Sequence, residues 1–218
     1  MFRLTMHYPP PLFRDRTEAG EKLGQGLLAV ELQDPVVLAI PAGGVPVGAE
    51  IARILGAPLN LIIARKIQFP WTTEAGFGAV VSDGTVYLGP HSKTLPREAV
   101  EAQTQKALGE VEHRKQEFLE DRQEIDISDK DAILVDDGLA TGSTMIAAVT
   151  ALKKRAPRRV IVAVPTASGT AVNLLRPRVD QLISLYVHPE HMPFAVASSY
   201  HQWHDLTDQE VKEYLGEL

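Results

Sequence analysis

Short, largely apolar runs alternate with stretches of helical periodicity along this sequence, and this alternation limits the possible folds more than any other feature. Strands buried on both faces of a parallel sheet are continuous apolar runs of this kind. The runs are residues 35–40, 59–64, 132–136, 158–165 and 181–187. The helical patterns cover residues 17–32, 45–55, a stretch ending at 155, and 170–175. The order predicts an α/β protein with a parallel sheet, right-handed crossovers and helices on its faces.

Three further segments have their own local signals. Residues 77–89 hold two β-prone runs separated by Ser-Asp-Gly, which predicts a hairpin. Residues 96–124 are long, charged and helical in pattern, and we interpret this helix as a solvated surface element. Near the C-terminus, Thr207 and Glu210 have the spacing of a capping box and predict a terminal helix.

Composition excludes several classes of protein. The net charge of −6 argues against a nucleic-acid binder held mainly by phosphate contacts. Without cysteine, the chain can form neither a disulfide framework nor a thiolate metal site. No apolar run approaches the roughly 20 residues that span a bilayer, and no signal-peptide core precedes the three early prolines. We therefore expect a cytoplasmic protein without membrane contact.

The candidate functional residues follow the predicted strands. Ligands of such sheets bind at the carboxyl ends of the strands. Loops 41–44, 65–71 and 136–144 are expected to leave those ends on one edge and to form one composite site.

Loop 136–144 opens with two adjacent acids, Asp136 and Asp137, and continues with glycines and small hydroxyl residues up to a helix. Glycines allow close backbone approach, and a helix N-terminus offers unpaired N–H groups to a phosphate. The carboxylates repel a phosphate but suit hydroxyl groups or a divalent cation next to it. A ribose 5-phosphate unit meets both demands. The simpler alternative is that the acids cap the helix and the glycines turn the chain.

Two common phosphate-binding loops do not match this segment. A Walker loop requires Gly-Lys-Ser/Thr, and residues 138–144 contain no lysine. A dinucleotide fingerprint requires Gly-x-Gly-x-x-Gly, whereas the spacing here is Gly-x-x-x-Gly.

The segment ILVDDGLATGST resembles the phosphoribosyl pyrophosphate (PRPP) signature of type I phosphoribosyltransferases. PAGGV and IIARK also lie where that family has its pyrophosphate loop and basic residues. The resemblance covers most of the chain and is closest to small bacterial stand-alone members whose base is unknown. It implies a twisted parallel sheet with a hairpin-bearing lid over 68–89 and a C-terminal hood over the base. We expect one domain over 1–218, with a core of about 17–187 and a hood formed by 188–218 and the N-terminal lead-in.

The resemblance also implies a function. The reaction would transfer the phosphoribosyl group of PRPP to a nitrogenous base with release of pyrophosphate, in nucleotide and nucleoside metabolism. Mg²⁺ would be the cofactor and a homodimer the assembly, and nucleic acid would not be a partner.

Carried over position by position, the resemblance assigns a role to each candidate residue. Asp136 and Asp137 would bind the ribose hydroxyls and face Mg²⁺. The 5-phosphate would be bound by Gly138, Ala140, Thr141, Gly142, Ser143 and Thr144. The pyrophosphate would be bound by Ala42, Gly43, Gly44, Arg65 and Lys66. Lys66 and Glu74 are the catalytic candidates, and Phe194, Tyr200 and Trp203 are the candidates for stacking on the base.

Two positions depart from the family pattern. Ala140 stands where hypoxanthine and guanine enzymes usually carry an acid, so the loop looks more like the adenine or orotate type. Ala42 stands where the pyrophosphate loop commonly carries Arg or Lys.

Several alternatives stay open. A non-catalytic regulatory protein could bind PRPP or a nucleotide on the same scaffold, and hydrolysis of a phosphoribosyl ester is a third possibility. His201, His204 and Asp205 could ligate a metal, although a hood wall is the better interpretation of this His-rich segment. A solvent-facing loop residue is the simpler and better interpretation of Glu74.

Overall fold

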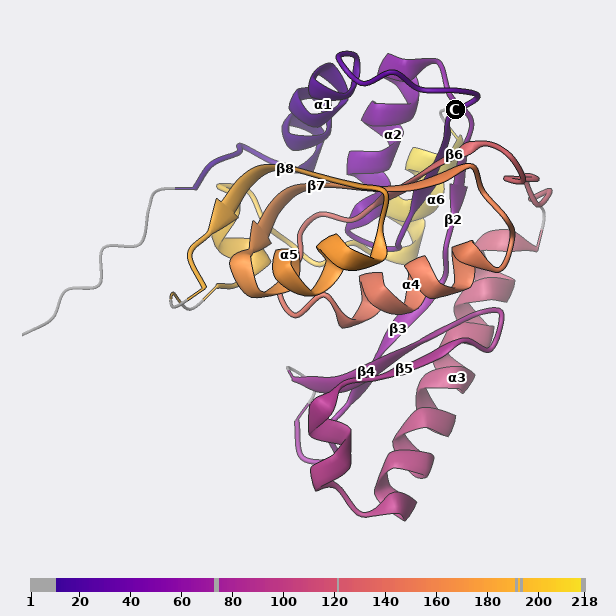
Figure 1. The fold of residues 1–218 in the computed structure, drawn as a ribbon, viewed down its shortest axis with the longest axis vertical. Coiled ribbons are helices and arrows are strands. Elements are labelled where there is room, and N and C mark those ends of the chain that lie inside the picture. The colour runs from indigo at the N-terminus through magenta and orange to yellow at the C-terminus, as the bar shows by residue number, and fades with distance from the viewer. Residues whose placement is uncertain (1–10, 73–74, 121, 191, 193, 217–218) are drawn as a thin grey trace, which may run out of the picture.

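The main sheet has five parallel strands and confirms the predicted architecture (Figure 1). In this computed structural model, residues 11–72, 75–120, 122–190, 192 and 194–216 are described. The strands, in spatial order, are β2 (Leu59–Leu61), β1 (Val36–Ala39), β6 (Asp131–Val135), β7 (Arg159–Ser168) and β8 (Gln181–His188). Each matches one of the apolar runs, because strands that are covered on both faces carry mostly apolar side chains; the exception in burial is β8, whose Leu185, Tyr186 and Val187 are exposed.

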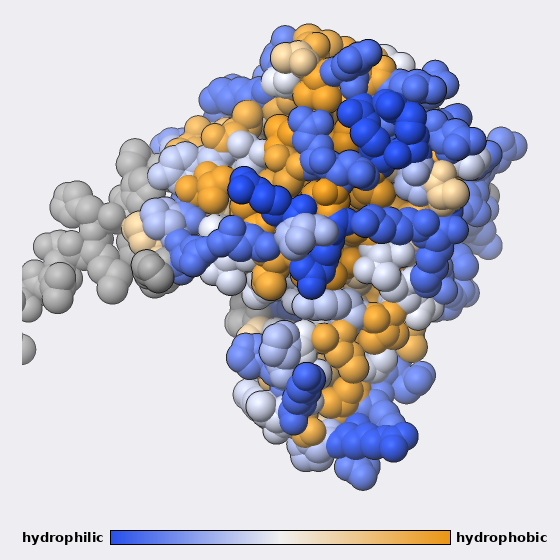
Figure 2. Space-filling view, viewed as in Figure 1, coloured by the Kyte–Doolittle hydropathy of each residue, from blue (hydrophilic) through white to orange (hydrophobic). Residues whose placement is uncertain are grey.

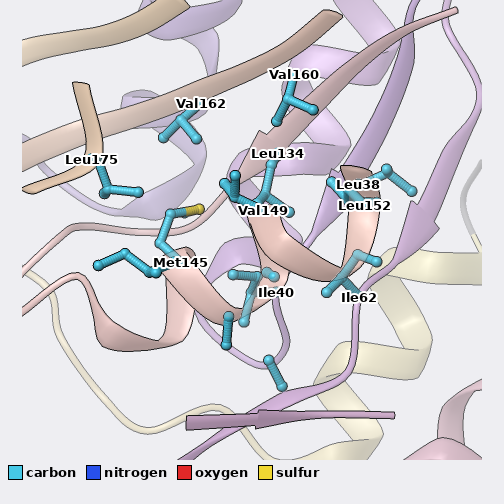
Figure 3. Packing of buried hydrophobic residues seen from close by; sticks show 14 of the residues in the cluster. Leu38, Ile40, Ile62, Leu134, Met145, Val149, Leu152, Val160, Val162 and Leu175 are labelled. Carbon is cyan, nitrogen blue, oxygen red and sulfur yellow. The ribbon is translucent and has the colours of Figure 1, made fainter. Parts of the chain in front are cut away.

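Helices cover both faces of this sheet. On one face lie α1 (Arg16–Leu27), α2 (Gly44–Leu55) and α6 (Asp208–Gly216). On the other face lie α4 (Ser143–Lys153) and α5 (Gly169–Leu175). Successive strand residues point to opposite faces. Leu38 and Leu134 therefore pack on Met145 and Leu152 of α4 (Figure 3), whereas Val37 faces the α1 and α2 side.

A second, smaller sheet extends from the core toward the lower end of the molecule in Figure 1. It is antiparallel and consists of β3 (Ala64–Gln68), β4 (Gly76–Val81) and β5 (Val86–Leu88). The long helix α3 (Arg97–Leu119) covers one face of it, and α4 packs near the other. Apolar residues reach the surface over this lobe (Figure 2), among them the exposed Val86 and Leu88 of β5. Three 3₁₀ turns, η1 (Pro90–Thr94), η2 (Arg176–Arg178) and η3 (Val196–Ser199), complete the described elements.

This second sheet corrects one expectation. Residues 65–71 were expected to form a loop, but 65–68 belong to strand β3. The hairpin β4–β5 is confirmed, and β3 pairs with it, with Lys66 opposite Ala79. Phe77, expected in a lid, is only 1% exposed and packs against Phe69. The described part of 68–89 is therefore largely built into a sheet, because Phe77 and Val80 of β4 are buried on the α3 side and Ala79 and Val81 on the α4 side.

The segment that precedes α1 pairs with the segment that precedes α6. Phe13 N–H donates to Ser199 O at 3.0 Å, and His201 N–H donates to Phe13 O at 2.9 Å. The predicted capping box is present at the start of α6: Glu210 N–H donates to Thr207 Oγ1, and Thr207 N–H donates to Glu210 Oε2. None of the helices within the described ranges has the length and apolar character needed to cross a membrane.

Candidate functional site

Two of the predicted loops meet at the switch point of the main sheet. The connections of β1 and of β6 run to opposite faces of the sheet, and a crevice opens between two such strands at their carboxyl ends. Residues 41–43 follow β1, and residues 136–142 follow β6. Ile40 N–H donates to Val135 O at 2.9 Å, which holds the two loops side by side.

A cleft of about 310 Å³ lies at this crevice. It collects most of the predicted phosphoribosyl-binding residues. The cleft is lined by Ile40, Pro41, Ala64, Arg65, Lys66, Gly76, Asp136, Gly138, Leu139, Ala140, Thr141, Gly142, Thr144, Met145 and Val196. Ser143 instead lines an adjoining cavity of about 440 Å³, which shares Gly76, Ala140 and Thr141 with the cleft.

The loop 138–142 is held by strand β7. Leu139 N–H donates to Thr166 O at 2.9 Å, and Ser168 N–H donates to Leu139 O at 2.8 Å. Ser168 Oγ also donates to Ala140 O at 2.6 Å. Gly142 has φ +77°, a left-handed conformation that favours glycine. The loop is therefore tied down through Leu139 and the carbonyl of Ala140.

The N–H groups of this loop remain available. Within the described part of the chain, those of Ala140, Thr141 and Gly142 donate to no protein acceptor. They lie beside the N-terminus of α4, whose dipole also attracts anions. Thr141 and Ser143 add hydroxyl groups whose oxygens are 3.5 Å apart. This arrangement suits a phosphate monoester.

The two acids occupy different environments. Asp136 lines the cleft and accepts a hydrogen bond from Asp137 N–H at 2.9 Å. The Asp137 side chain is buried and forms an ion pair with Arg16 at 2.8 Å. Burial, and next the negative charge of Asp137, raise the pKa of Asp136 well above its usual range. Burial also raises the pKa of Asp137, although the Arg16 guanidinium opposes this.

Gly43 and Gly44 are placed close to the acidic pair. A methyl group on Gly44 would lie 2.8 Å from Val135 O, and one on Gly43 would overlap the Asp137 carboxylate. Gly44 N–H already donates to Ile40 O at 3.0 Å, so it is not a free donor to pyrophosphate. Gly43 N–H has no acceptor among the described residues, and it lies at the N-terminus of the 12-residue helix α2. Ala42 is partly buried against the core.

Arg65 and Lys66 bring positive charge to the opposite wall of the cleft. Arg65 also forms an ion pair with Glu110 of α3 at 3.0 Å, so part of its charge is balanced. The stem of Lys66 lies over Gly76, where an added methyl group would be 2.3 Å from Lys66 Cγ. Glu74 lies outside the described residues.

The aromatic candidates are separated. Phe194 lines the adjoining cavity and packs on His188, with ring centroids 4.3 Å apart. Tyr200 is buried, and its hydroxyl donates to Asp137 O at 2.6 Å. The Trp203 ring is covered by the Arg16 guanidinium at 3.8 Å. Neither ring lines the cleft or the adjoining cavity, and the stacking of Tyr200 and Trp203 on a base stays a prediction.

Sequence reasoning missed Arg16, Thr166 and Val196. Val196 and Thr166 pack on Gly138, where an added methyl group would lie 2.7 Å from Val196 Cγ1. Arg16 begins α1 directly after the N-cap Asp15, so its local sequence explains a helix start and nothing more. No local signal connects it with an acid 121 positions away.

The donors present fit a magnesium ion that arrives with a phosphorylated ligand. Mg²⁺ commonly uses one or two carboxylates together with substrate phosphates and water. Asp136 supplies such a carboxylate at the cleft. Across the described ranges, no group of three or more His, Cys, Asp or Glu side chains could form a metal site by itself. This includes the His201, His204 and Asp205 alternative, since His204 pairs with Glu210 at 2.8 Å.

Comparison with known proteins decides the family. Residues 16–177 match the model of the phosphoribosyl transferase domain. The chain belongs to this family. The same residues contain the cleft loops and the acidic pair, so the phosphoribosyl transferase match covers the candidate site.

Relatives agree with this assignment. Rv0571c of Mycobacterium tuberculosis, whose name gives phosphoribosyl transferase as a provisional activity, is 34% identical over 210 residues, covering 94% of this chain and 46% of its own length. The chain thus spans about half the length of the curated relatives it matches. The crystal structure of TT1426 from Thermus thermophilus superposes with a TM-score of 0.78 at 35% identity, covering 94% of this chain and 98% of TT1426. A ribose-phosphate pyrophosphokinase from Haemophilus ducreyi is 44% identical over 61 residues, covering 27% of this chain and 19% of that enzyme.

Proposed function

We propose that this phosphoribosyl transferase family protein transfers the 5-phosphoribosyl group of PRPP to a nitrogen of a base and releases pyrophosphate. The observation that carries the proposal is the pairing of a phosphate-binding loop with a carboxylate in one cleft. The unpaired N–H groups of residues 140–142 suit the 5-phosphate, and Asp136 lies in the same cleft. A ligand with a phosphate and vicinal hydroxyls fits this combination.

In the reaction, a lone pair on the base nitrogen forms the new bond to C1 of the ribose. The C1–oxygen bond breaks, its electron pair leaves with pyrophosphate, and the base nitrogen loses a proton to solvent. Positive charge develops on the ribose while negative charge grows on the leaving group. Fixed donors and cations that face the leaving group lower the barrier.

The chain's own residues would supply these interactions. Asp136 would hold the ribose hydroxyls and orient C1. Lys66, Arg65 and the Gly43 N–H would bind the pyrophosphate, helped by the α2 N-terminus. Mg²⁺, when bound with PRPP at Asp136, would neutralise charge on the leaving group. Phe194, which lines the adjoining cavity, would stack on the base, with Tyr200 and Trp203 as the other aromatic candidates, and Glu74 stays a proposal for proton transfer.

The first experiment is calorimetric titration of the protein with PRPP and Mg²⁺. Binding to the wild type and its loss in Asp136→Asn are expected, with ribose 5-phosphate also binding. Pyrophosphate release on mixing PRPP with a panel of purine and pyrimidine bases then identifies the acceptor. A wild type that binds neither PRPP nor ribose 5-phosphate would contradict the proposal.

A binding-only regulatory role is the second candidate. Ala42 places no cation in the pyrophosphate loop, and Arg65 is partly balanced by Glu110. Both features weaken the stabilisation of a leaving pyrophosphate more than the binding of the sugar phosphate. PRPP binding without pyrophosphate release from any base would favour this role.

We also propose a homodimer, on the basis of the family resemblance. Sedimentation at micromolar concentration tests it. A single species of 23.9 kDa would remove this proposal without affecting the transfer reaction.

A further inference from the structure

The side chain of Arg16 makes three different contacts in the interior. Its Nε donates to Asp137 Oδ2 at 2.8 Å, its Nη1 donates to His204 O at 2.9 Å, and its guanidinium lies 3.8 Å from the Trp203 ring centroid. Arg16 is only 7% exposed. Only a planar guanidinium can make two directed hydrogen bonds and stack on a ring at once, so lysine could not replace it fully.

These contacts join three distant parts of the chain at the second acid. Arg16 comes from α1, Asp137 from the loop after β6, and Trp203 from the C-terminal segment. Tyr200 adds a fourth contact, because its hydroxyl donates to the Asp137 carbonyl at 2.6 Å. Both the side chain and the backbone of Asp137 are therefore engaged by the protein itself.

Asp136 differs on each of these points. It lines the cleft, and Asp137 does not. Its carboxylate accepts a hydrogen bond from the neighbouring N–H of Asp137 and also interacts with the Asp137 carboxyl group. The Asp137 carboxylate instead packs on Gly43 and Arg16. The adjacent acids thus present one carboxylate to the ligand and one to the protein interior.

We propose that Arg16 is a positioning residue that holds Asp137 away from the ligand, so that Asp136 alone contacts the ribose and its cation. The inference rests on the proposed function for the identity of the ligand. It replaces the symmetric roles expected for the two acids with a division between them. Arg16 also cancels one negative charge of the pair, which weakens the attraction of the site for bare divalent cations.

The ion pair between Arg16 and Asp137 is tested by thermal unfolding of Arg16→Gln, Asp137→Asn and the double variant. Breaking a buried ion pair from one side leaves the other charge uncompensated and strongly destabilises a protein. We expect Arg16→Gln to lower the melting temperature by roughly 10 °C, and the double variant to lose less than the sum of the two single variants. Arg97→Gln, which removes an exposed pair with Glu101, is the matched control and should change the melting temperature by about 1 °C or less. Simple additivity in the cycle would overturn the pairing.

Whether Arg16 keeps Asp137 away from the cation is tested by measuring the affinity for Mn²⁺ alone, by electron paramagnetic resonance. Releasing Asp137 and removing a positive charge should let both carboxylates meet the ion, so Arg16→Gln should bind Mn²⁺ about tenfold more tightly than wild type. Adding Asp137→Asn should abolish that gain. A merely structural role of Arg16 gives no gain, and that result would overturn the proposal. If Arg16→Gln fails to fold, Asp137→Asn and Asp136→Asn carry the test: the first should bind Mn²⁺ about as tightly as wild type and the second should lose most of the affinity, and equal losses in both variants would overturn the proposal.

PRPP binding with Mg²⁺ separates the two acids. Asp136→Asn should lose at least a hundredfold in affinity with little change in melting temperature. Asp137→Asn should lose less than tenfold, together with several degrees of melting temperature. Equal losses of affinity in both variants, with equal stability, would overturn the division of roles. If wild type binds no PRPP, the proposed function fails, whereas the unfolding cycle and the Mn²⁺ comparison still decide the role of Arg16.

Discussion

Gly43 packs directly against the carboxylate of Asp137: a methyl group on Gly43 would lie 2.0 Å from Asp137 Oδ2 and 2.5 Å from its Cγ. The loop after β1 and the loop after β6 therefore touch at a position where only a hydrogen atom fits. Arg16 holds the same carboxylate from another direction at 2.8 Å. Asp137 is therefore held on two sides, by Gly43 and by Arg16.

Gly43→Ala is predicted to weaken both the fold and the site. Forcing a methyl group into a filled space typically costs about 1–3 kcal/mol. Displacement of Asp137 would also shift Asp136, so affinity for PRPP should fall. Urea unfolding and calorimetry with PRPP and Mg²⁺ measure the two effects.

Gly109→Ala is the matched control for this change. Gly109 lies inside α3, and nothing lies within 4 Å of an added methyl group. Alanine is the better helix former, so this variant should gain roughly 0.5–1 kcal/mol. An unchanged urea midpoint in Gly43→Ala would show that the two loops separate easily, which the packing argues against.

Ala42→Arg is predicted to tighten the binding of pyrophosphate. Loop 41–43 has backbone groups to offer an anion but no side-chain cation of its own. One charge-assisted hydrogen bond is typically worth about 1.5–3 kcal/mol, which corresponds to roughly ten- to a hundredfold in affinity. Calorimetry with Mg-pyrophosphate checks it, and any transferase rate should rise in parallel if the new side chain reaches the cleft.

Ala42→Gln controls for side-chain length without charge, and it should leave the affinity for pyrophosphate close to that of wild type. If wild type already binds pyrophosphate tightly and Ala42→Arg adds no affinity, the prediction is wrong. Arg65, Lys66 or the loop backbone would then be sufficient, and the binding-only role would lose its main support.

Much of the fold could be predicted because its signals are local. Four of the five strands of the main sheet are buried along nearly their whole length, so each is marked by its own apolar run, and the partly exposed β8 has a run as well. Strand β3 has no such mark. Arg65, Lys66 and Gln68 are poor strand residues, and they are extended because β3 pairs with β4 and packs on α3. That pairing is a tertiary effect that overrides local preference.

The features of the site also separate into those with a local sequence signal and those without one. The phosphate-binding loop could be predicted because its glycines, hydroxyls and helix start are contiguous in sequence. The different roles of Asp136 and Asp137 could not, since they depend on Arg16, 121 positions from Asp137. The contact between the Arg16 guanidinium and the Trp203 ring could not be predicted for the same reason, because the two residues are far apart in sequence.

Asp131→Asn is predicted to destabilise the protein at the amino end of β6, the end of the strand opposite the cleft. The buried carboxylate of Asp131 accepts hydrogen bonds from Arg159, Arg158 and the Gln33 N–H. Burial alone would raise its pKa, but these hydrogen bonds outweigh it and lower the pKa below the usual value. Replacing the charge with an amide should cost roughly 2–3 kcal/mol in urea unfolding at pH 7.

Asp126→Asn is the control for this variant, because Asp126 is exposed and, among the residues that the structure describes, hydrogen-bonds only to the nearby Ser128. It should change stability by less than about 0.5 kcal/mol. The lowered pKa of Asp131 fixes how its contribution to stability changes with pH. The contribution is fully present above pH 3.8, the ordinary pKa of the group, and is lost as pH falls through the lower pKa of the folded protein. The difference between wild type and Asp131→Asn should therefore shrink in strong acid, and a difference that stays constant there would contradict the role of the charge.

His188 gives the last prediction, a loss of stability in mild acid. Burial lowers its pKa below 6.5, its Nε2 lies 3.0 Å from Thr166 Oγ1, and Phe194 packs on its ring. In the unfolded chain His188 takes up a proton as pH falls below about 6.5, whereas the folded protein resists protonation down to its lower value. The unfolded state then holds more protons, so stability must fall with falling pH, by at most about 1.4 kcal/mol per pH unit.

Urea unfolding from pH 7.5 to pH 5 should show this slope in wild type and in the exposed control His201→Gln, and a shallower slope in His188→Gln. Equal slopes in all three proteins would mean that His188 is protonated in the folded state as readily as in the unfolded chain, and that the cluster with Thr166 and Phe194 tolerates its charge.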